Sequence, residues 1–567
     1  MNLNTEQQFS LIPQIHAPRS VFDRSFTHKT TMNVNKLYPI FIDEALPGDS
    51  MKLKFQVFGR LQNPLVVPVM DELYFETLWF KSRMRLLWDN AYKFFGEKDN
   101  PSDTTQYTIP TINSSTGFAV DSLADHFGIP VGVANLDVNS LPFRFYNLTY
   151  NQWLRDQNLI NSVTVPTGDT DSASNYSILT SAKMHDLFTS CLPSTQLGDP
   201  VTFPVGATAP VIGNGIALGL VSNMNNPSAS SRNACGVISA TTNGYGRCAT
   251  ATGAYGLAVG TSISETTSNN IYSNNALGVS PDPNKSGLVA DLSTATGINV
   301  NDLRFMFKLQ QYREKLLTGG HRYREIISNF FNVDQLDKNP YTVEFLGMTR
   351  EMIDINTVVQ TSSTSSTSPQ GHLTSYGVVN AFESGFSTSF VEHSYIMGLA
   401  RIRHNPVYQQ GLEKMWSRTT ALDFYNPMFN GLGEQPVLNR EIMAQGNSVL
   451  DSNGDIVDEQ AFGFNEAWYE YRYKPSYITG QLRSGITQSL DVYHLAQYFG
   501  TYSNGTYTPV LPKLNQSFIE ENIPIDRVLS VATTQYIPQF VMDFRFEYEC
   551  AREIPVRNIP AGLYSGI

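Results

Sequence analysis

The chain has 567 residues, of which 41% are hydrophobic, 12% aromatic and 16% charged. This length allows three or four domains at about 150 residues each, or one large β domain with long insertions. The apolar content supports a substantial core and excludes global disorder. The formal net charge of −12 disfavours a protein that wraps nucleic acid by itself, because such proteins are normally basic.

Four cysteines are spread through the chain without a CxxC pair, at positions Cys191, Cys235, Cys248 and Cys550. This spacing supports neither a zinc ribbon nor a dense disulfide framework, and it favours a reducing compartment. Residues 1–20 lack a basic start and an apolar run, so we expect no secretory signal. No run of about 18 apolar residues occurs, so we expect no membrane span.

Three segments alternate between apolar and polar residues: residues 51–57, 469–473 and 540–550. Alternation with a period of two predicts strands that place one face on a core. Because strands at both extremes of the chain flank long irregular stretches, the pattern predicts one β sandwich with expanded loops.

Helices are expected at fewer places. Residues 73–95 are rich in aromatic and aliphatic side chains and are expected to be partly helical, and residues 148–158 are a second candidate. The best-defined helix covers residues 302–317, with Asn301 placed to cap it and Gly319-Gly320 placed to end it.

Two stripes run along the helix at 302–317. The apolar stripe consists of Phe305, Leu309, Tyr312 and Leu316. The basic stripe beside it consists of Arg304, Lys308, Gln311 and Lys315. A solvated helix face is one interpretation of the basic stripe, and contact with phosphates or an acidic partner is the other. A smaller basic run, formed by Lys81, Arg83 and Arg85, allows the same two interpretations.

The segment 201–300 differs in composition from the rest of the chain. At the average charged fraction it would hold about 16 charged residues, but it holds only Arg232, Arg247, Glu265, Asp282, Lys285 and Asp291. Gly, Ala, Ser, Thr and Asn dominate, yet Val, Ile, Leu and Tyr recur. We interpret the segment as a long insertion that packs against copies of itself, because a free tail does not explain the apolar residues.

No motif for catalysis or metal binding emerges. HExxH, GxSxG and Walker sequences are absent, and the nine histidines lack metal-ligand spacing. Residues 451–455 resemble the start of a calcium loop, but Ile456 and Phe462 occupy the positions that need Gly and Glu, so we predict a hairpin tip. The carboxylate pairs Asp43-Glu44 and Glu520-Glu521 are interpreted as surface or turn residues. We therefore predict no enzyme activity, metal or cofactor.

Several short sequence motifs indicate a known protein family. They are FDRSFTHKT (22–30), DEALPGD (43–49), FGRL (58–61), VPVMDEL (67–73), LWDN (87–90), LPFRFYNLTYNQWLRDQNL (141–159), HDLFTSCLP (185–193), INVNDLRFMFKLQQYREK (298–315) followed by GG and RYREII (322–327), LGEQPV (432–437) and WYEYRYKPS (468–476). With these motifs the chain closely resembles the major capsid proteins of the gokushovirus branch of the Microviridae, which are small single-stranded DNA phages.

The resemblance implies a mainly β fold: a viral eight-stranded antiparallel jelly roll across residues 1–567, with long loop insertions and a few short helices. It implies an icosahedral (T=1) shell of identical copies around a circular single-stranded DNA genome. The insertion 201–300 would build a projection at the three-fold axes, and residues 301–330 would form a short basic helix region.

The same resemblance implies partners and a location. The partners would be further copies of the chain, the DNA, a small basic DNA-binding protein, a pilot protein and a bacterial host receptor. The protein would be part of the virion and assemble in the host cytoplasm. We expect Arg304, Lys308 and Lys315 as first candidates for DNA contact.

Lys81, Arg83 and Arg85 are the second set of DNA-contact candidates. The host contacts would lie within 201–300 at residues the sequence does not identify, and a passive spacer is the alternative for that segment.

A spike or tail fibre is an alternative function of the protein. A secreted carbohydrate-binding β protein is another, although it would need a signal peptide or a paired acid and base in a Trp-lined cleft.

Overall fold

The computed structural model describes residues 18–199, 201, 300–320, 322–332, 341–366, 369–503, 506–531, 533 and 537–556, together with short strands between residues 211 and 290. The chain divides into two compact units. One consists of Met1–Leu197 and Glu314–Ile567, and the other of Gly198–Arg313.

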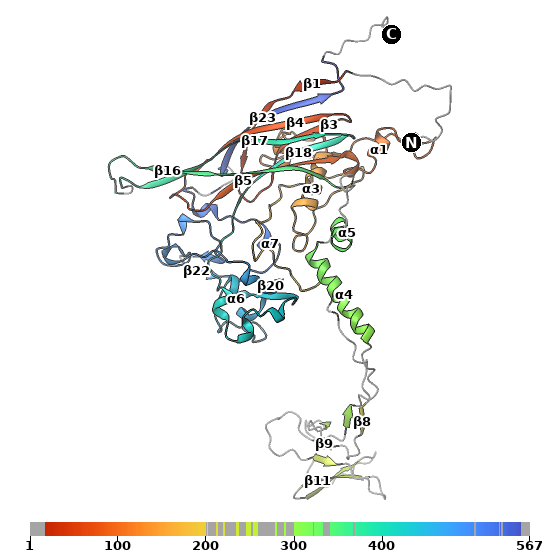
Figure 1. Ribbon diagram of the computed structural model, residues 1–567, viewed down its shortest axis with the longest axis vertical. Coiled ribbons are helices and arrows are strands. Elements are labelled where there is room, and N and C mark those ends of the chain that lie inside the picture. The colour runs from red at the N-terminus through yellow and green to blue at the C-terminus, as the bar shows by residue number, and fades with distance from the viewer. Residues whose placement is uncertain are drawn as a thin grey trace. The chain divides into compact units, whose positions relative to one another are not determined.

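The two largest antiparallel sheets lie in the larger unit (Figure 1). The first has the order β2 (Phe26–Met32), β23 (Phe540–Arg552), β4 (Ser50–Leu61) and β17 (Leu373–Ser389), with β1 (Ser20–Asp23) also on β23 and β16 (Asp354–Val359) beyond β17. The second has the order β3 (Tyr38–Ala45), β18 (Ser394–His404), β5 (Leu73–Arg83) and β15 (Glu344–Met352).

The strand pairs are nested along the chain. The innermost pair is β5 with β15, and it is enclosed in turn by β4 with β17, β3 with β18 and β2 with β23. This nesting describes one long hairpin that is folded over into two sheets, which is the jelly-roll arrangement. The mainly β, eight-stranded jelly roll expected from the sequence is therefore confirmed.

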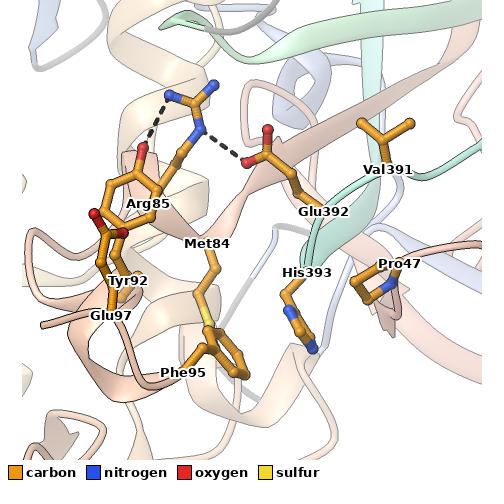
Figure 2. A pocket seen from close by; sticks show the side chains of 10 residues that line it. Pro47, Met84, Arg85, Tyr92, Phe95, Glu97, Val391, Glu392 and His393 are labelled. Carbon is orange, nitrogen blue, oxygen red and sulfur yellow. Dashed lines mark hydrogen bonds and ion pairs between the residues drawn. The ribbon is translucent and has the colours of Figure 1, made fainter. Parts of the chain in front are cut away.

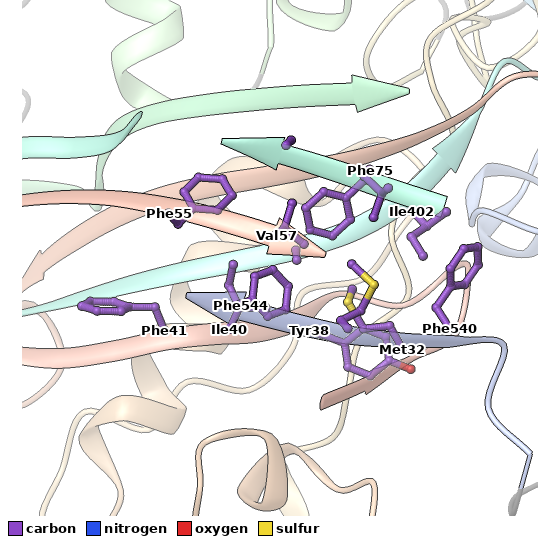
Figure 3. Packing of buried hydrophobic residues seen from close by; sticks show 14 of the residues in the cluster. Met32, Tyr38, Ile40, Phe41, Phe55, Val57, Phe75, Ile402, Phe540 and Phe544 are labelled. Atoms are coloured by element: carbon purple, nitrogen blue, oxygen red, sulfur yellow. The ribbon is translucent and has the colours of Figure 1, made fainter. Parts of the chain in front are cut away.

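Alternating strands supply the core between the sheets. In β4 the side chains of Phe55 and Val57 are buried, while those of Lys52 and Gln56 face solvent. The predicted strands at 51–57 and 540–550 are thus confirmed as β4 and β23. Figure 3 shows Phe41, Phe55, Phe75 and Phe544 gathered between the strands. Burying each such ring stabilises the fold by about 1.5–3 kcal/mol.

The second sheet is covered on both faces. Every residue of β18 is buried, because its other face packs beneath a second hydrophobic cluster that includes Phe80 and Met397. This cluster also holds residues of α2 (Leu123–His126) and α3 (Leu141–Thr149). The first part of the segment between β5 and β15, which includes α2 and α3, therefore covers the outer face of the second sheet.

The secondary structure predicted for two segments was wrong because burial or tertiary context overrode the local pattern. The segment 73–95, expected to be partly helical, is mostly strand β5, with only one helical turn at α1 (Ala91–Phe94). Both faces of β5 are buried, so it lacks the alternation that identifies a strand. The strand predicted at 469–473 is a 3-10 turn over Tyr469–Tyr471, which follows β20 (Ala461–Glu466) and a left-handed Trp468 with φ +64°.

The other local predictions were close to the structure. Helix α4 runs over Val300–Thr318 and ends at Gly319-Gly320, where Gly320 has a φ of +92° that favours glycine. Asn301 lies inside the helix, so its predicted capping role was wrong. The helix expected at 148–158 starts earlier, as α3, and ends in a π turn over Tyr150–Leu154.

The predicted hairpin tip at 451–455 is confirmed. The Asp451 Oδ1 atom accepts hydrogen bonds from the backbone N–H groups of Asn453 (2.8 Å) and Asp455 (3.0 Å). Leu450 and Ile456 pair across the turn as an antiparallel bridge.

The smaller unit contains short antiparallel strand pairs. They are β8 (Val211–Gly213) with β14 (Leu288–Ala290), β9 (Gly219–Val221) with β10 (Ala234–Gly236) and β13 (Gly278–Val279), and β11 (Tyr245–Thr250) with β12 (Gly253–Ala258). The unit extends to Arg313 and so includes the first part of α4. Packing of the insertion against other copies stays a prediction.

Gly398 offers a test of the packing between sheet and core. It lies in β18 against the ring of Trp79, and a Cβ atom at this position would overlap that ring. We predict that Gly398→Ala lowers the free energy of unfolding of the subunit by about 1–3 kcal/mol, the usual effect of overpacking. Urea unfolding would measure the loss. Gly168→Ala is the matched control, because nothing lies within 4 Å of a Cβ atom there, and an equal loss in both variants would contradict the packing argument.

Candidate interaction surfaces

The described part of the chain offers no grouping suited to metal chemistry. Among these residues no three His, Cys, Asp or Glu side chains are placed to hold a metal ion. No described helix is long and apolar enough to cross a membrane. Cys191 and Cys550 are buried thiols, and burial raises the pKa of both.

A buried charge cluster lies on β5 and β18. Glu76 is fully buried and accepts hydrogen bonds from Nε of Arg350 (2.6 Å) and Nε of Arg401 (2.8 Å), while an Arg403 nitrogen lies 3.6 Å away. Burial alone would raise the pKa of Glu76, but the three guanidinium groups outweigh it and lower that pKa. Burial and the neighbouring Arg403 lower the pKa of Arg401 to about 10.

This cluster attaches two segments outside the sheet, at residues 181–182 and at residue 521, to β18. Arg401 donates to Ser181 Oγ (3.0 Å), and Arg403 donates to the carbonyl of Ala182 (2.8 Å). His404 Nδ1 lies 3.0 Å from a carboxylate oxygen of Glu521. Glu521 is buried, so the expectation that it lies on the surface was wrong. The cluster is structural, since every charge in it has an opposite charge within the same chain.

We predict that Glu76→Gln costs about 3–5 kcal/mol of unfolding free energy at pH 7, because buried guanidinium groups lose their counter-charge. The pKa of Glu76 is lowered below its ordinary value of 4.5 in the fold. Its contribution is therefore present above pH 4.5 and is lost as the pH falls through the folded-state pKa. Urea unfolding at pH 7 and pH 3.5 should show a smaller difference between the two proteins in acid.

The exposed Glu547 on β23 provides the control. Glu547→Gln should change unfolding by less than about 0.5 kcal/mol, as is usual for surface positions. A Glu76→Gln variant that is as stable as the unaltered chain at pH 7 would contradict the role assigned to the cluster.

The basic run at residues 81–85 lies at the end of β5 and in the 3-10 turn that follows it, and it is paired within the chain. Lys81 Nζ lies 3.2 Å from a Glu344 oxygen, Arg83 lies 3.4 Å from Glu392, and Arg85 lies 2.8 Å from Glu392. Lys81 also donates to Thr388 Oγ1 (2.9 Å). The structure thus brings these three sequence-predicted residues close to two carboxylates, which compensate most of their charge.

Arg85 also lines a pocket of about 350 Å³ (Figure 2). The rings of Phe95 and His393 stack in it, with centroids 3.8 Å apart and planes at 11°. Met84 and Pro47 add apolar lining. Because Glu392 pairs with Arg85, as the dashed line in Figure 2 shows, the pocket suits an apolar or aromatic group better than a phosphate.

The basic stripe of α4 is exposed. Arg304, Lys308 and Lys315 all face solvent, although Lys308 Nζ donates to Gln311 Oε1 (3.0 Å) and Lys315 lies 5.1 Å from the centre of the Phe330 ring. Two members of the apolar stripe, Phe305 and Tyr312, are exposed as well. Leu309 and Leu316 are half-buried.

One surface was missed by sequence reasoning. Residues 412–432, named here the aromatic loop, expose nine large apolar side chains: Leu412, Met415, Trp416, Leu422, Phe424, Tyr425, Met428, Phe429 and Leu432. Three 3-10 turns shape the loop, over Lys414–Ser417, Ala421–Asp423 and Pro427–Phe429. Its apolar residues follow neither helical nor strand spacing. The available signal was a high apolar content among Pro, Asn and Gly breaks.

A nested eight-stranded jelly roll is the fold that viral coat proteins share with lectin domains and cupins, and the exposed apolar surfaces are typical of a protein that associates with partners. The model of the capsid protein (F protein) family matches residues 10–562, so the chain belongs to that family. It is 42% identical to capsid protein VP1 of Bdellovibrio phage phiMH2K, with 98% of each chain covered.

Two further relatives agree over nearly their whole length. The chain is 36% identical to capsid protein VP1 of Chlamydia phage 1, covering 98% of this chain and 97% of the relative. It is 34% identical to capsid protein VP1 of Spiroplasma virus 4, covering 97% of both. The resemblance that the sequence motifs indicated is confirmed. The chain is a structural capsid protein and a component of the virion.

Proposed function

We propose that this capsid protein is the repeating subunit of an icosahedral T=1 shell that encloses a circular single-stranded DNA genome. The observation that carries the proposal is the jelly roll with its nested strand pairs, which is combined with a family match over almost the whole chain. Assembly would take place in the cytoplasm of the bacterial host. A spike, a tail fibre or a secreted carbohydrate-binding protein is not supported, because the family is a capsid family.

The genome needs positive charge that this chain lacks in bulk. The net charge is −12, and Lys81, Arg83 and Arg85 are paired with carboxylates. We therefore propose that a separate small basic protein, polyamines or metal ions neutralise most phosphates. Arg304, Lys308 and Lys315 remain the first candidates for DNA contact because they are exposed, and the run at 81–85 is the second set.

The unaltered chain should form closed megadalton particles that protect DNA from nuclease. We predict that Arg304→Gln, Lys308→Gln and Lys315→Gln together leave particle formation intact but reduce DNA content and increase DNA loss in high salt. The reason is that each phosphate contact releases counterions and contributes to salt-dependent affinity. Sedimentation and absorbance at 260 and 280 nm would measure the two quantities.

A matched control removes the same charge elsewhere. Lys52, Arg60 and Arg545 are exposed on β4 and β23, so changing all three to Gln gives an equal loss of positive charge. An equal loss of DNA in both triple variants would show that only total charge matters. Unchanged DNA content in the α4 variant would exclude these residues as the contact.

We propose that the insertion 201–300 forms a projection at the three-fold axes and meets a receptor on the bacterial host. The low charge of the segment and its separation into a compact unit support an exposed role. A pilot protein would accompany the shell in the virion. A passive spacer is the alternative for this segment.

Deletion of residues 210–290 tests the insertion. We predict that particles still form, because the jelly-roll strands and their pairing lie outside the deleted segment. Adsorption to host cells should fall strongly if the insertion carries the receptor contact. Counting unadsorbed particles after mixing with cells measures this, and normal adsorption would support the passive spacer instead.

A further inference from the structure

We propose that the aromatic loop, residues 412–432, is a contact surface that seats on a second copy of this chain. The inference rests on the proposed function, since it requires a shell of identical copies, and it assigns one surface to that assembly. Neither the sequence motifs nor the family match identifies this loop as a contact.

The first argument is exposure. Met428 is 89% exposed, and Trp416 and Leu422 are each 70% exposed. Large exposed apolar patches on proteins mark interaction sites. The exposed side chains of the loop therefore favour a surface that a partner covers.

The second argument is that two aromatic side chains of the loop form a cluster with an arginine and with aromatic residues outside the loop. The Tyr425 ring centre lies 5.5 Å from that of Trp468 and 6.2 Å from that of Tyr471. The Arg418 guanidinium lies 4.6 Å from the Tyr471 ring centre and 5.3 Å from that of Phe424. Aromatic and arginine side chains gathered in this way are typical of the centre of a protein interface.

The third argument is that the loop is held in shape before any partner binds. The Asp423 carboxylate accepts hydrogen bonds from the backbone N–H groups of Thr419 (2.8 Å) and Thr420 (2.7 Å). Asn426 Oδ1 accepts from the N–H of Met428 (3.0 Å), and Tyr471 Oη accepts from the N–H of Tyr425 (3.3 Å). A surface that is already ordered loses little entropy on association.

The fourth argument concerns charge and selects the kind of partner. The cations in and beside the loop are Lys414, Arg418, Arg472 and Lys474, and the anions are Glu413, Asp423, Glu434, Glu466 and Glu470. The charges sum to 4 − 5 = −1, and Arg418 pairs with Glu470 at 3.1 Å while Lys474 pairs with Glu413 at 2.6 Å. A surface without excess positive charge does not attract nucleic acid, so a protein surface fits better.

A hollow beside the cluster completes the surface. A pocket of about 350 Å³ is lined by Tyr425, Leu432, Trp468 and Tyr471, among others. It is large enough for one side chain of a neighbouring copy to enter, as anchor residues do at interfaces. In a shell of identical subunits, every subunit meets further copies of itself, so we assign a second copy as the partner.

The experiment changes Met428 in the full chain. Met428→Asp should lower particle yield at least about tenfold, because a charge would have to lose its water at the contact. The soluble subunit should keep its circular dichroism spectrum and melting temperature, since the side chain is exposed in the subunit. Met428→Leu is the matched control, because it keeps an apolar side chain, and it should assemble normally.

A second measurement tests directly whether residue 428 is buried in the particle. The thiol introduced by Met428→Cys should react with a maleimide much more slowly in particles than in dissociated subunits, as followed by peptide mass spectrometry. Normal assembly of Met428→Asp, equal loss in Met428→Leu, or equal labelling in particles and subunits would each overturn the inference while the proposed function stands. Failure of the unaltered chain to form particles would overturn the proposed function and the inference together.

Discussion

The fold depends on the pairing of the last strand with the first ones. β23 lies between β2 and β4, and its end pairs with β1, so that Arg552 is opposite Ser20. This is visible in Figure 1, where the red β1 runs beside the blue β23. The sandwich closes only when both ends of the chain meet. Such non-local pairing is slow to form, but it leaves the length of intervening segments weakly constrained, because closure entropy grows slowly with loop length.

The insertions use this freedom. Two connections, from β5 to β15 and from β18 to β23, hold most of the non-strand residues. Both begin at adjacent strands of the second sheet, whose outer face carries the apolar cover and the Glu76 charge cluster. The sheet thus has two roles: its inner face stabilises the sandwich, and its outer face fixes the insertions that present new surfaces.

How well each part could be predicted from the sequence depends on which faces are buried. β4 and β23 have one solvated face, so their alternation was visible, whereas β5 and β18 are covered on both faces and showed none. The jelly roll was predicted from the sequence motifs that resemble a capsid protein family. The partners of the basic run could not be predicted, because Glu344 and Glu392 are distant in sequence and reach it only through pairing of β15 and β18 with β5. The aromatic loop has no periodic pattern to reveal it.

Charge separates the two tasks of the subunit. The cations near the aromatic loop and in the run at residues 81–85 lie close to carboxylates. The contact proposed for the aromatic loop would therefore depend mainly on apolar burial, which salt does not screen. Contacts with DNA depend on unmatched cations and weaken steeply with salt. In the proposed shell, such a subunit would hold its copies together under ionic conditions that loosen the genome. An acidic coat whose cations are paired with its own carboxylates would then enclose DNA through closure of the shell more than through attraction to its contents.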